Sequence, residues 1–155
     1  MDLPFTASLP HCPHSEVRIM GLDLGRKRIG VALSDALGIT AQGLMVLERQ
    51  DNATDLARII ALARQHHITG IVIGLPRHMN GRLGASAAEV FDWVAQLQQA
   101  LAIPVHTWDE RLTTVQAERI LLDANLSRRR RRQVIDKMAA VLILQAFLDQ
   151  RRPSP

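Results

Sequence analysis

The sequence predicts an α/β domain built on an open sheet of five strands. Two observations point to this fold class. Three strand-like segments come first, and from residue 52 onward stretches with helical periodicity alternate with short apolar strands. The chain has 155 residues, 47% of them hydrophobic, which is enough for one domain with a substantial core.

The sheet is expected to begin with a hairpin. Residues 17–24 alternate as a strand does, with Ile19, Gly21 and Asp23 on one side and apolar residues on the other, and a second alternating run covers residues 28–35. Gly25 permits either a positive φ or a close backbone approach in the turn between them. The turn carries three cations, Arg26, Lys27 and Arg28.

The next elements follow from changes in periodicity. Residues 43–48 read as a third strand, and from residue 52 to about 66 an apolar stripe at helical spacing leaves Asp55 and Arg58 outside it. Residues 71–73 are wholly apolar, as expected of a strand buried on both faces. A capping-box pattern, Ser86 to Glu89, opens a helix that continues to about residue 101.

The last third of the chain is predicted as a strand at 104–108, a helix from about 115 to 124 and a final helix from about 133 to 150. Thr113 and Gln116 form a capping box for the first of these helices. The apolar side of the final helix is expected to comprise Ile135, Met138, Ala139, Leu142, Ile143, Ala146 and Phe147.

The ends of the chain have a different character. Residues 1–16 contain three prolines and little periodicity, so we expect a flexible N-terminal extension, a domain at 17–150 and a short tail at 151–155. A signal-peptide pattern and a long apolar run are both missing, and the single cysteine, Cys12, suits a reducing compartment. These features predict a cytoplasmic protein without membrane association. Cys12 with His11 and His14 is too small a set for a structural zinc site.

The charge favours a polyanionic partner. The formal net charge is +4, the isoelectric point is near 10.5, and only two of the nineteen basic residues are lysines. Arginine pairs with phosphate in a bidentate manner, although arginine preference can also follow genome composition and a modest charge can serve solubility alone. Residues 128–132 are five consecutive arginines, expected to be exposed and mobile unless a polyanion neutralises them.

A polar loop at 77–84 is a second candidate for phosphate contact. It lies between a buried strand and a helix N-terminus, where free backbone N–H groups and the helix dipole favour anions. Asn80 and Arg82 are its best-suited side chains. The alternative is a loop whose Gly and Asn residues serve backbone geometry only.

Three carboxylates are the candidate catalytic groups. Asp23 and Glu110 stand near strand ends, the edge at which open α/β sheets bind ligands, and Asp136 stands in the expected first turn of the last helix. Each has a local alternative. Asp23 can be a turn former, Glu110 can pair with Arg111 or stabilise a helix start, and Asp136 can complement the helix dipole.

Taken together, these acids predict a metal site. Ala139 and Ala140 would let the last helix lie close to the sheet and carry Asp136 toward the strand ends. Three clustered carboxylates repel one another unless cations bind, and oxygen ligands suit Mg²⁺ or Mn²⁺. Two such ions can activate water on one side of a phosphodiester and stabilise the leaving oxygen on the other.

Four segments carry a family resemblance: GLDLGRKRIGVALSD (21–35), GLPRHMNGRLG (74–84), DERLTTVQAE (109–118) and DKMAAVLILQAFLD (136–149). In order and spacing they resemble the signature segments of the YqgF family, also called RuvX, of Holliday junction resolvase-like proteins. The resemblance implies a ribonuclease H-like fold, with three antiparallel strands followed by parallel strands and helices on both faces. It also implies a metal-dependent endonuclease that matures the precursor of 16S ribosomal RNA, with its acids at Asp23, Glu110 and Asp136.

The leading hypothesis is therefore a hydrolase that cleaves structured RNA with two divalent ions, leaving a 5′-phosphate and a 3′-hydroxyl. Asp23 would bridge the ions, and Glu110 and Asp136 would complete their ligand shells. The expected partners are precursor ribosomal RNA and ribosomal precursor particles, with the protein a monomer or weak dimer. The expected phosphate contacts are Arg26, Lys27, Arg28, Asn80, Arg82, Arg111, Arg128, Arg129, Arg130, Arg131 and Arg132.

Three alternatives stay open at this point. A DNA junction resolvase would need two active sites and hence a dimer. A non-catalytic RNA-binding or transcription accessory protein would bind RNA in a salt-dependent way without metal or cleavage. A phosphotransferase related to the actin and sugar-kinase folds would need two lobes, and 155 residues supply one.

Overall fold

The computed structural model describes residues 17–75, 87–109 and 128–151, with the backbone alone at 128–136. The domain contains five strands and three helices within these ranges. They are β1 (Ile19–Leu24), β2 (Arg28–Ser34), β3 (Ala41–Glu48), α1 (Asn52–Gln65), β4 (Gly70–Leu75), α2 (Ala87–Leu101), β5 (Val105–Asp109) and α4 (Arg128–Arg151). The predicted helix at 115–124 lies outside the described residues.

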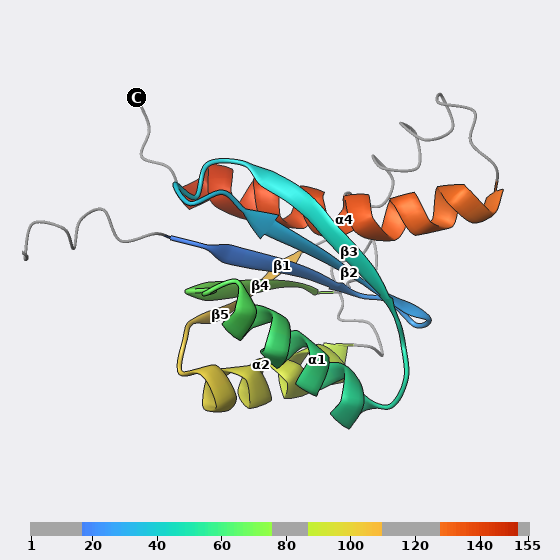
Figure 1. Ribbon diagram of the computed structural model, residues 1–155, viewed down its shortest axis with the longest axis horizontal. Coiled ribbons are helices and arrows are strands. Elements are labelled where there is room, and N and C mark those ends of the chain that lie inside the picture. Colours follow the sequence, from blue (N-terminus) through green and yellow to red (C-terminus); the bar gives the residue numbers. More distant parts are fainter. Residues whose placement is uncertain (1–16, 76–86, 110–127, 152–155) are drawn as a thin grey trace, which may run out of the picture.

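The strands form one mixed sheet in the order β3-β2-β1-β4-β5. The pairs β1–β2 and β2–β3 are antiparallel, whereas β1–β4 and β4–β5 are parallel. Helices α1 and α2 cover one face and α4 covers the other (Figure 1). The predicted five-stranded mixed sheet with helices on both faces is therefore confirmed.

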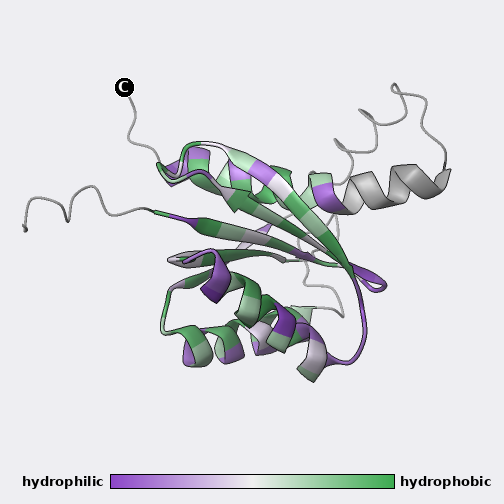
Figure 2. Ribbon diagram, in the orientation of Figure 1, coloured by the Kyte–Doolittle hydropathy of each residue, from purple (hydrophilic) through white to green (hydrophobic). Residues whose placement is uncertain are grey.

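The larger core lies between the sheet and helices α1 and α2. Met20 and Leu22 of β1 are fully buried there, against Ile59 of α1 and Trp93 and Leu97 of α2. The hydropathy pattern follows this arrangement, with hydrophobic strands and a hydrophilic tip on the β1–β2 hairpin (Figure 2). Of the predicted α1 stripe, Leu56, Ile59 and Ala63 are buried and Ile60 is partly buried.

The second core lies under α4 and depends on small residues in the sheet. One row across β3, β2 and β1 consists of Gly43, Ala32 and Gly21, which are register partners. A Cβ placed on Gly21 would come within 2.7 Å of the Leu144 Cβ and 3.0 Å of the Ala140 carbonyl oxygen. Helix α4 therefore packs with its backbone close to β1, a distance that only glycine permits at this position.

The buried face of α4 differs from the predicted one. Ala140, Leu144 and Leu148 are buried together with the expected Ala139, Ile143 and Phe147. The expected Met138, Leu142 and Ala146 are only partly buried, and the side chain of the expected Ile135 is not among those described. Residues 138–148 are apolar almost all round the helix, so periodicity alone does not select the buried side. The register against the sheet selects it.

Two predicted boundaries were also wrong. Strand β3 begins at Ala41, two residues before the predicted start, and α4 begins at Arg128 rather than near residue 133. The arginine run therefore has helical backbone, consistent with the high helix propensity of arginine and with propagation from the packed part of the helix. Although α4 has 24 residues, no helix in the described ranges is both long and apolar enough to span a bilayer.

The close contact of α4 with β1 leads to the first prediction. Gly21→Ala should lower the free energy of unfolding by about 1–3 kcal/mol, because the new methyl group meets helix backbone that cannot move alone. Urea denaturation measures the change. Gly70→Ala is the control. Its Cβ would lie 3.0 Å from the terminal methyl of Ile19, a flexible side-chain end, and at an ordinary 3.7 Å from the Pro104 carbonyl oxygen, so its effect should stay below about 1 kcal/mol. Equal losses in both variants would contradict this account of the packing.

Candidate active site

Asp23 lies near the end of β1, on the sheet face that α4 covers. Side chains alternate along β1, so Asp23 shares its face with Gly21, which α4 contacts. Its partner on β2 is Gly30, and its side chain is only partly buried. The predicted position of Asp23 at an open strand end, beside glycine neighbours, is confirmed.

The backbone direction of α4 shows on which side of the helix–strand contact position 136 lies relative to Asp23. The Gln145 side chain binds the backbone N–H of Ala41, whereas Lys137 lies against Gly43, so α4 runs opposite to β3 and β1. Position 136 is one helical turn before Ala140, on the side toward which β1 runs from Gly21 to Asp23. The side chain of Asp136 itself is outside the description.

The local explanation for Asp136 does not hold. That alternative placed Asp136 in the first turn, where it would complement the helix dipole, but α4 begins at Arg128, more than two turns earlier. The dipole effect is confined to the first turn. A carboxylate at position 136 therefore gains little from the helix N-terminus.

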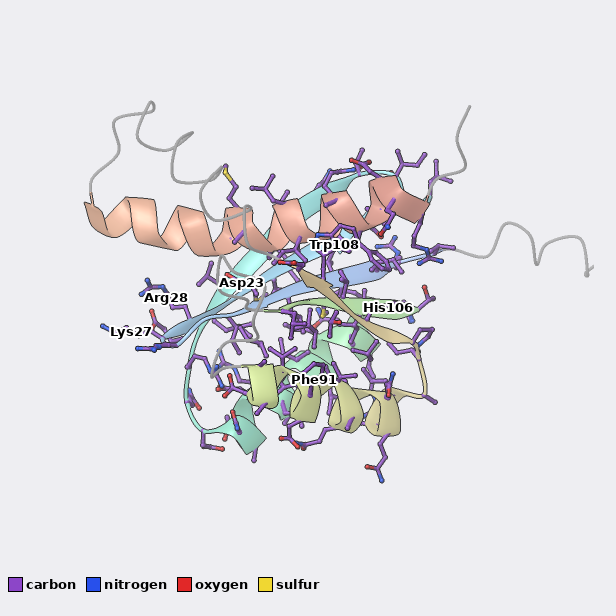
Figure 3. All side chains as sticks on the ribbon, turned by 180° about the vertical axis from the view of Figure 1, so that it is seen from behind. Asp23, Lys27, Arg28, Phe91, His106 and Trp108 are labelled. Atoms are coloured by element: carbon purple, nitrogen blue, oxygen red, sulfur yellow. The ribbon has the colours of Figure 1, made fainter. Side chains whose placement is uncertain are left out.

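Four of the predicted site residues lie outside the described residues: Asn80, Arg82, Glu110 and Arg111. The ends of their neighbouring strands are nevertheless in place. Leu75 of β4 pairs with Asp109 of β5, so the loops after β4 and β5 leave the sheet at the same edge. On β5, Trp108 packs edge-on against Phe147 of α4, with 6.2 Å between the ring centroids. Trp108 therefore lies on the same face of the sheet as Asp23 (Figure 3). Glu110 follows this strand directly in the sequence.

The predicted basic turn joins β1 to β2 beyond Asp23. Arg26 and Lys27 are exposed at its tip, and Arg28 begins β2 (Figure 3). Glycine is needed at position 25 because the Arg28 carbonyl approaches its backbone closely. The Gly25 N–H donates to that carbonyl at 2.9 Å, and a Cβ on residue 25 would lie only 2.7 Å from the same oxygen. The arginine-rich end of α4 extends past the sheet in the same direction as this tip (Figure 1).

Below the tip lies a partly buried ion network that the sequence did not reveal. Arg49 follows β3 and donates from Nη1 and Nη2 to the two carboxylate oxygens of Glu89, each at 3.1 Å. Its Nε donates to Asp55 at 3.3 Å, and its Nη1 also donates to the Gly25 carbonyl at 2.9 Å. Hydrogen bonding to Glu89 is the main cause that raises the pKa of Arg49.

Asp55 contradicts its predicted place outside the buried stripe of α1. Its side chain is fully buried and accepts hydrogen bonds from the Gln50 N–H, from Arg49 and from Arg58. A first-turn acid on a polar helix face gives no sign of such burial, because two of these donors precede the helix. Glu89 was expected only to cap its own helix, but its partner Arg49 is 40 residues away.

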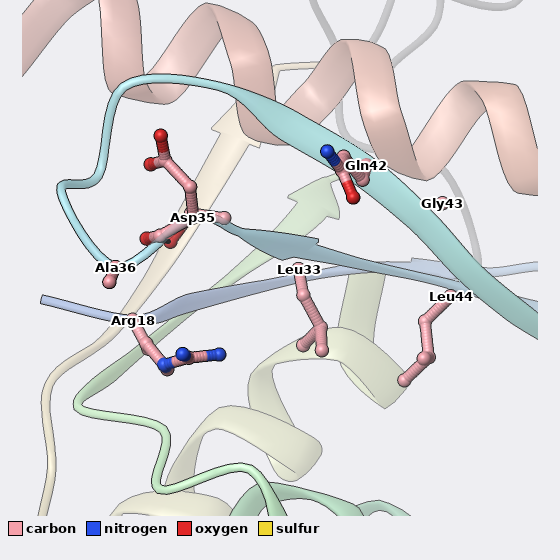
Figure 4. A pocket seen from close by; sticks show the side chains of 8 residues that line it. Arg18, Leu33, Asp35, Ala36, Gln42, Gly43 and Leu44 are labelled. Carbon is pink, nitrogen blue, oxygen red and sulfur yellow. Dashed lines mark hydrogen bonds between the residues drawn. The ribbon is translucent and has the colours of Figure 1, made fainter.

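A separate open pocket of about 310 Å³ lies at the other end of the sheet (Figure 4). Arg18, Asp35 and Gln42 line it together with apolar residues of β2 and β3. Arg18 precedes β1, whereas Asp23 stands near the far end of that strand. This pocket is therefore distinct from the strand edge that carries the candidate acids.

Within the described ranges, no three His, Cys, Asp or Glu residues group so as to hold a metal ion. Of the three predicted acids, Asp23 is the one whose side chain is described. The joint metal site of Asp23, Glu110 and Asp136 accordingly stays a prediction.

Comparison with known sequences adds a family. A model of the family described as "RuvX: Holliday junction resolvase" matches residues 17–150. A Moorella thermoacetica protein named "Putative pre-16S rRNA nuclease" is 57% identical over 134 residues, covering 86% of this chain and 96% of the relative. A Pelotomaculum thermopropionicum protein of the same name is 57% identical over 139 residues, covering 88% of this chain and 90% of the relative.

Comparison with solved structures identifies the fold. RuvC of T. thermophilus in complex with a Holliday junction substrate superposes with a TM-score of 0.50 and 16% identity, covering 86% of this chain and 95% of that one. The Fowlpox virus resolvase in complex with Holliday junction DNA gives a TM-score of 0.58 and 7% identity, covering 86% and 98%. The expected ribonuclease H-like fold is thereby confirmed.

The ion network leads to the second prediction. Asp55→Asn should lower the free energy of unfolding by about 3–5 kcal/mol, because the change removes a buried charge and leaves two arginines without their shared partner. Urea denaturation measures the loss. The control is Asp92→Asn, an exposed acid on α2 that binds Gln96, for which we expect a change within about 0.5 kcal/mol. A mild effect at Asp55 would show that the network contributes little to stability.

Proposed function

This chain belongs to the RuvX family and is a hydrolase of phosphodiester bonds, and we propose that it cleaves structured RNA by a mechanism that depends on divalent metal ions. The step is the 5′-end maturation of precursor 16S ribosomal RNA in the cytoplasm. The relatives' shared name supports the substrate, and the basic hairpin tip supports a polyanionic one.

The observation that carries the proposal is the place of Asp23. A partly buried carboxylate at a strand end, on the face covered by α4, stands where ligands bind in open α/β sheets. Position 136 lies one turn before the contact of Ala140 with Gly21, and Glu110 follows β5 directly. The backbone arrangement is therefore compatible with three acids meeting at one edge.

The donor chemistry fits the proposed ions. Asp23, Glu110 and Asp136 offer carboxylate oxygens, the ligands that Mg²⁺ and Mn²⁺ prefer. When bound, two such ions orient a water for attack at phosphorus and neutralise charge at the leaving oxygen. Asp23, Glu110 and Asp136 would hold these ions, with Asp23 as the ligand that both would share.

The basic residues hold the strand being cut. The hairpin tip, the loop after β4 and the arginine-rich start of α4 contact phosphates, which positions RNA without reading its sequence. Hydrolysis adds water across the bond between phosphorus and the 3′ oxygen, leaving a 5′-phosphate and a 3′-hydroxyl. The proposed partners are precursor ribosomal RNA and ribosomal precursor particles, with the protein a monomer or weak dimer.

A second candidate substrate is a four-way DNA junction, which the family's description names for the family. Resolution of a junction requires two symmetric cuts and therefore two copies of the active site. A dimer that cuts opposite strands at equal rates would favour this activity. A monomer that cuts RNA would favour the maturation role.

The third prediction concerns Asp23. Asp23→Asn should lower RNA cleavage by at least about a thousandfold, because the bridging ligand for both ions is lost while the fold is retained. Cleavage of a precursor 16S RNA in Mn²⁺ measures the rate, and calorimetric titration with Mn²⁺ measures binding of the ion.

Asp35→Asn is the matched control. Asp35 follows the other strand of the same hairpin at its opposite end, and the N–H of Ile39 lowers the pKa of its carboxyl. This variant should cleave like wild type. Wild-type rates in the Asp23 variant would remove the proposed mechanism.

The fourth prediction decides between substrates. Purified protein is incubated with precursor 16S RNA and with a four-way DNA junction, side by side, with Mn²⁺ and with EDTA. We expect Mn²⁺-dependent cleavage of the RNA at least about tenfold faster than cleavage of the junction. RNA binding without any cleavage would instead identify a non-catalytic binding protein.

A further inference from the structure

We propose that Arg49 is a positioning residue for RNA binding: it holds the basic tip of the β1–β2 hairpin in place against the first turn of α2. The proposal rests on the proposed function, because it concerns how the tip engages phosphates. Arg49 itself touches no reacting group in this proposal. It acts through the backbone of residues 25–28.

The contacts of Arg49 with the tip come from both its backbone and its side chain. The Arg49 N–H donates to the Lys27 carbonyl at 2.8 Å. Its Nη1 donates to the Gly25 carbonyl at 2.9 Å. One residue therefore binds two carbonyl groups that lie on either side of Arg26, and so restricts the tip on both sides of that residue.

The other contacts of the guanidinium anchor it to the helices. Glu89 in the first turn of α2 accepts two hydrogen bonds, Asp55 accepts one, and Asn52 of α1 accepts one at 2.9 Å. The Arg49 side chain is 12% exposed and its guanidinium lies 6.0 Å from the Trp93 ring. Such an enclosed, multiply bonded side chain has little freedom to move.

This arrangement has a consequence for binding. Arg26, Lys27 and Arg28 carry like charges on one short turn, so repulsion favours a spread of tip conformations. A mobile tip would lose conformational entropy on binding a phosphate backbone, which lowers affinity. By restricting the tip beforehand, Arg49 reduces that entropy loss. Because Glu89 lies in the first turn of α2, the same side chain also links the tip to the start of that helix.

Arg58 offers a matched comparison within the same network. It shares Asp55 with Arg49, at 3.3 Å, but its other contact is the Glu48 carbonyl at the end of β3. Within the part of the chain that the structure describes, neither of these bonds of Arg58 reaches the hairpin tip. A change at Arg58 therefore removes one cation from the network and leaves the anchoring of residues 25–28 intact.

The first experiment measures the mobility of the hairpin tip and does not depend on RNA cleavage. Hydrogen exchange of the free protein is compared for wild type, Arg49→Gln and Arg58→Gln. We expect faster exchange at residues 25–28 in the Arg49 variant alone, by about tenfold or more. Equal acceleration in both variants, or none in either, would overturn the anchoring role. Arg49→Lys is the second variant if Arg49→Gln does not fold, since lysine keeps the charge but cannot span Glu89 and Gly25 together.

The second experiment is a double-mutant cycle on RNA binding, in EDTA so that no cleavage occurs. The probe is a hairpin RNA carrying the 5′ leader of precursor 16S RNA. Lys27→Gln should reduce the slope of log affinity against log salt by about one in the wild-type and Arg58→Gln backgrounds. In the Arg49→Gln background its effect should fall by at least half, because the tip is already displaced.

The outcomes separate this inference from the proposed function. An equal effect of Lys27→Gln in all backgrounds, or no effect in wild type, would overturn the positioning role. Failure of the wild-type protein to cleave RNA would refute the proposed function while leaving both measurements valid. Where cleavage occurs, Arg49→Gln should raise KM at least threefold and leave kcat within twofold. This pattern is expected when a variant weakens binding of the substrate and of the transition state equally.

Discussion

The close approach of α4 to β1 is the constraint on which the rest of the structure depends. A helix can pack with its backbone this near a sheet only where the facing residues lack bulk, and here they are Gly43, Ala32 and Gly21. The contact of Gly21 with Ala140 and Leu144 sets the register of the helix along the strand. That register in turn determines how far position 136 lies from Asp23.

A second constraint comes from buried charge on the opposite face. Asp55 is fully buried, and breaking such an ion pair is far more costly than losing one at the surface. Arg49 and Arg58 neutralise it, while Arg49 extends the network to Glu89 and to the hairpin backbone. The basic tip therefore rests on a rigid, electrically compensated base.

Fold and function have separate support in this protein. The two resolvase structures compared above, at 16% and 7% identity, establish a ribonuclease H-like fold, and one fold hosts many activities. Family membership and relatives at 57% identity establish the nuclease class. Neither decides between RNA and a DNA junction, because the relatives' name points to RNA whereas the family's description names a junction. Phosphate contacts do not decide it either, since they position a nucleic acid without identifying it.

Sequence alone predicted the strands and helices of the described residues, apart from some of their bounds, and the family resemblance implied the mixed sheet. Alternation, helical periodicity and capping patterns depend on neighbours a few residues apart, so the strands, both described central helices and the strand-end place of Asp23 were predictable. Local pattern does not reveal which residues meet across the fold. Only the tertiary structure decided which side of α4 is buried and that Asp55 is enclosed. It also showed that α4 begins at Arg128, so that Asp136 does not lie in the first turn of the helix. The pairing of Arg49 with Glu89 spans 40 residues, and its energy exists only once α2 has packed beside the hairpin.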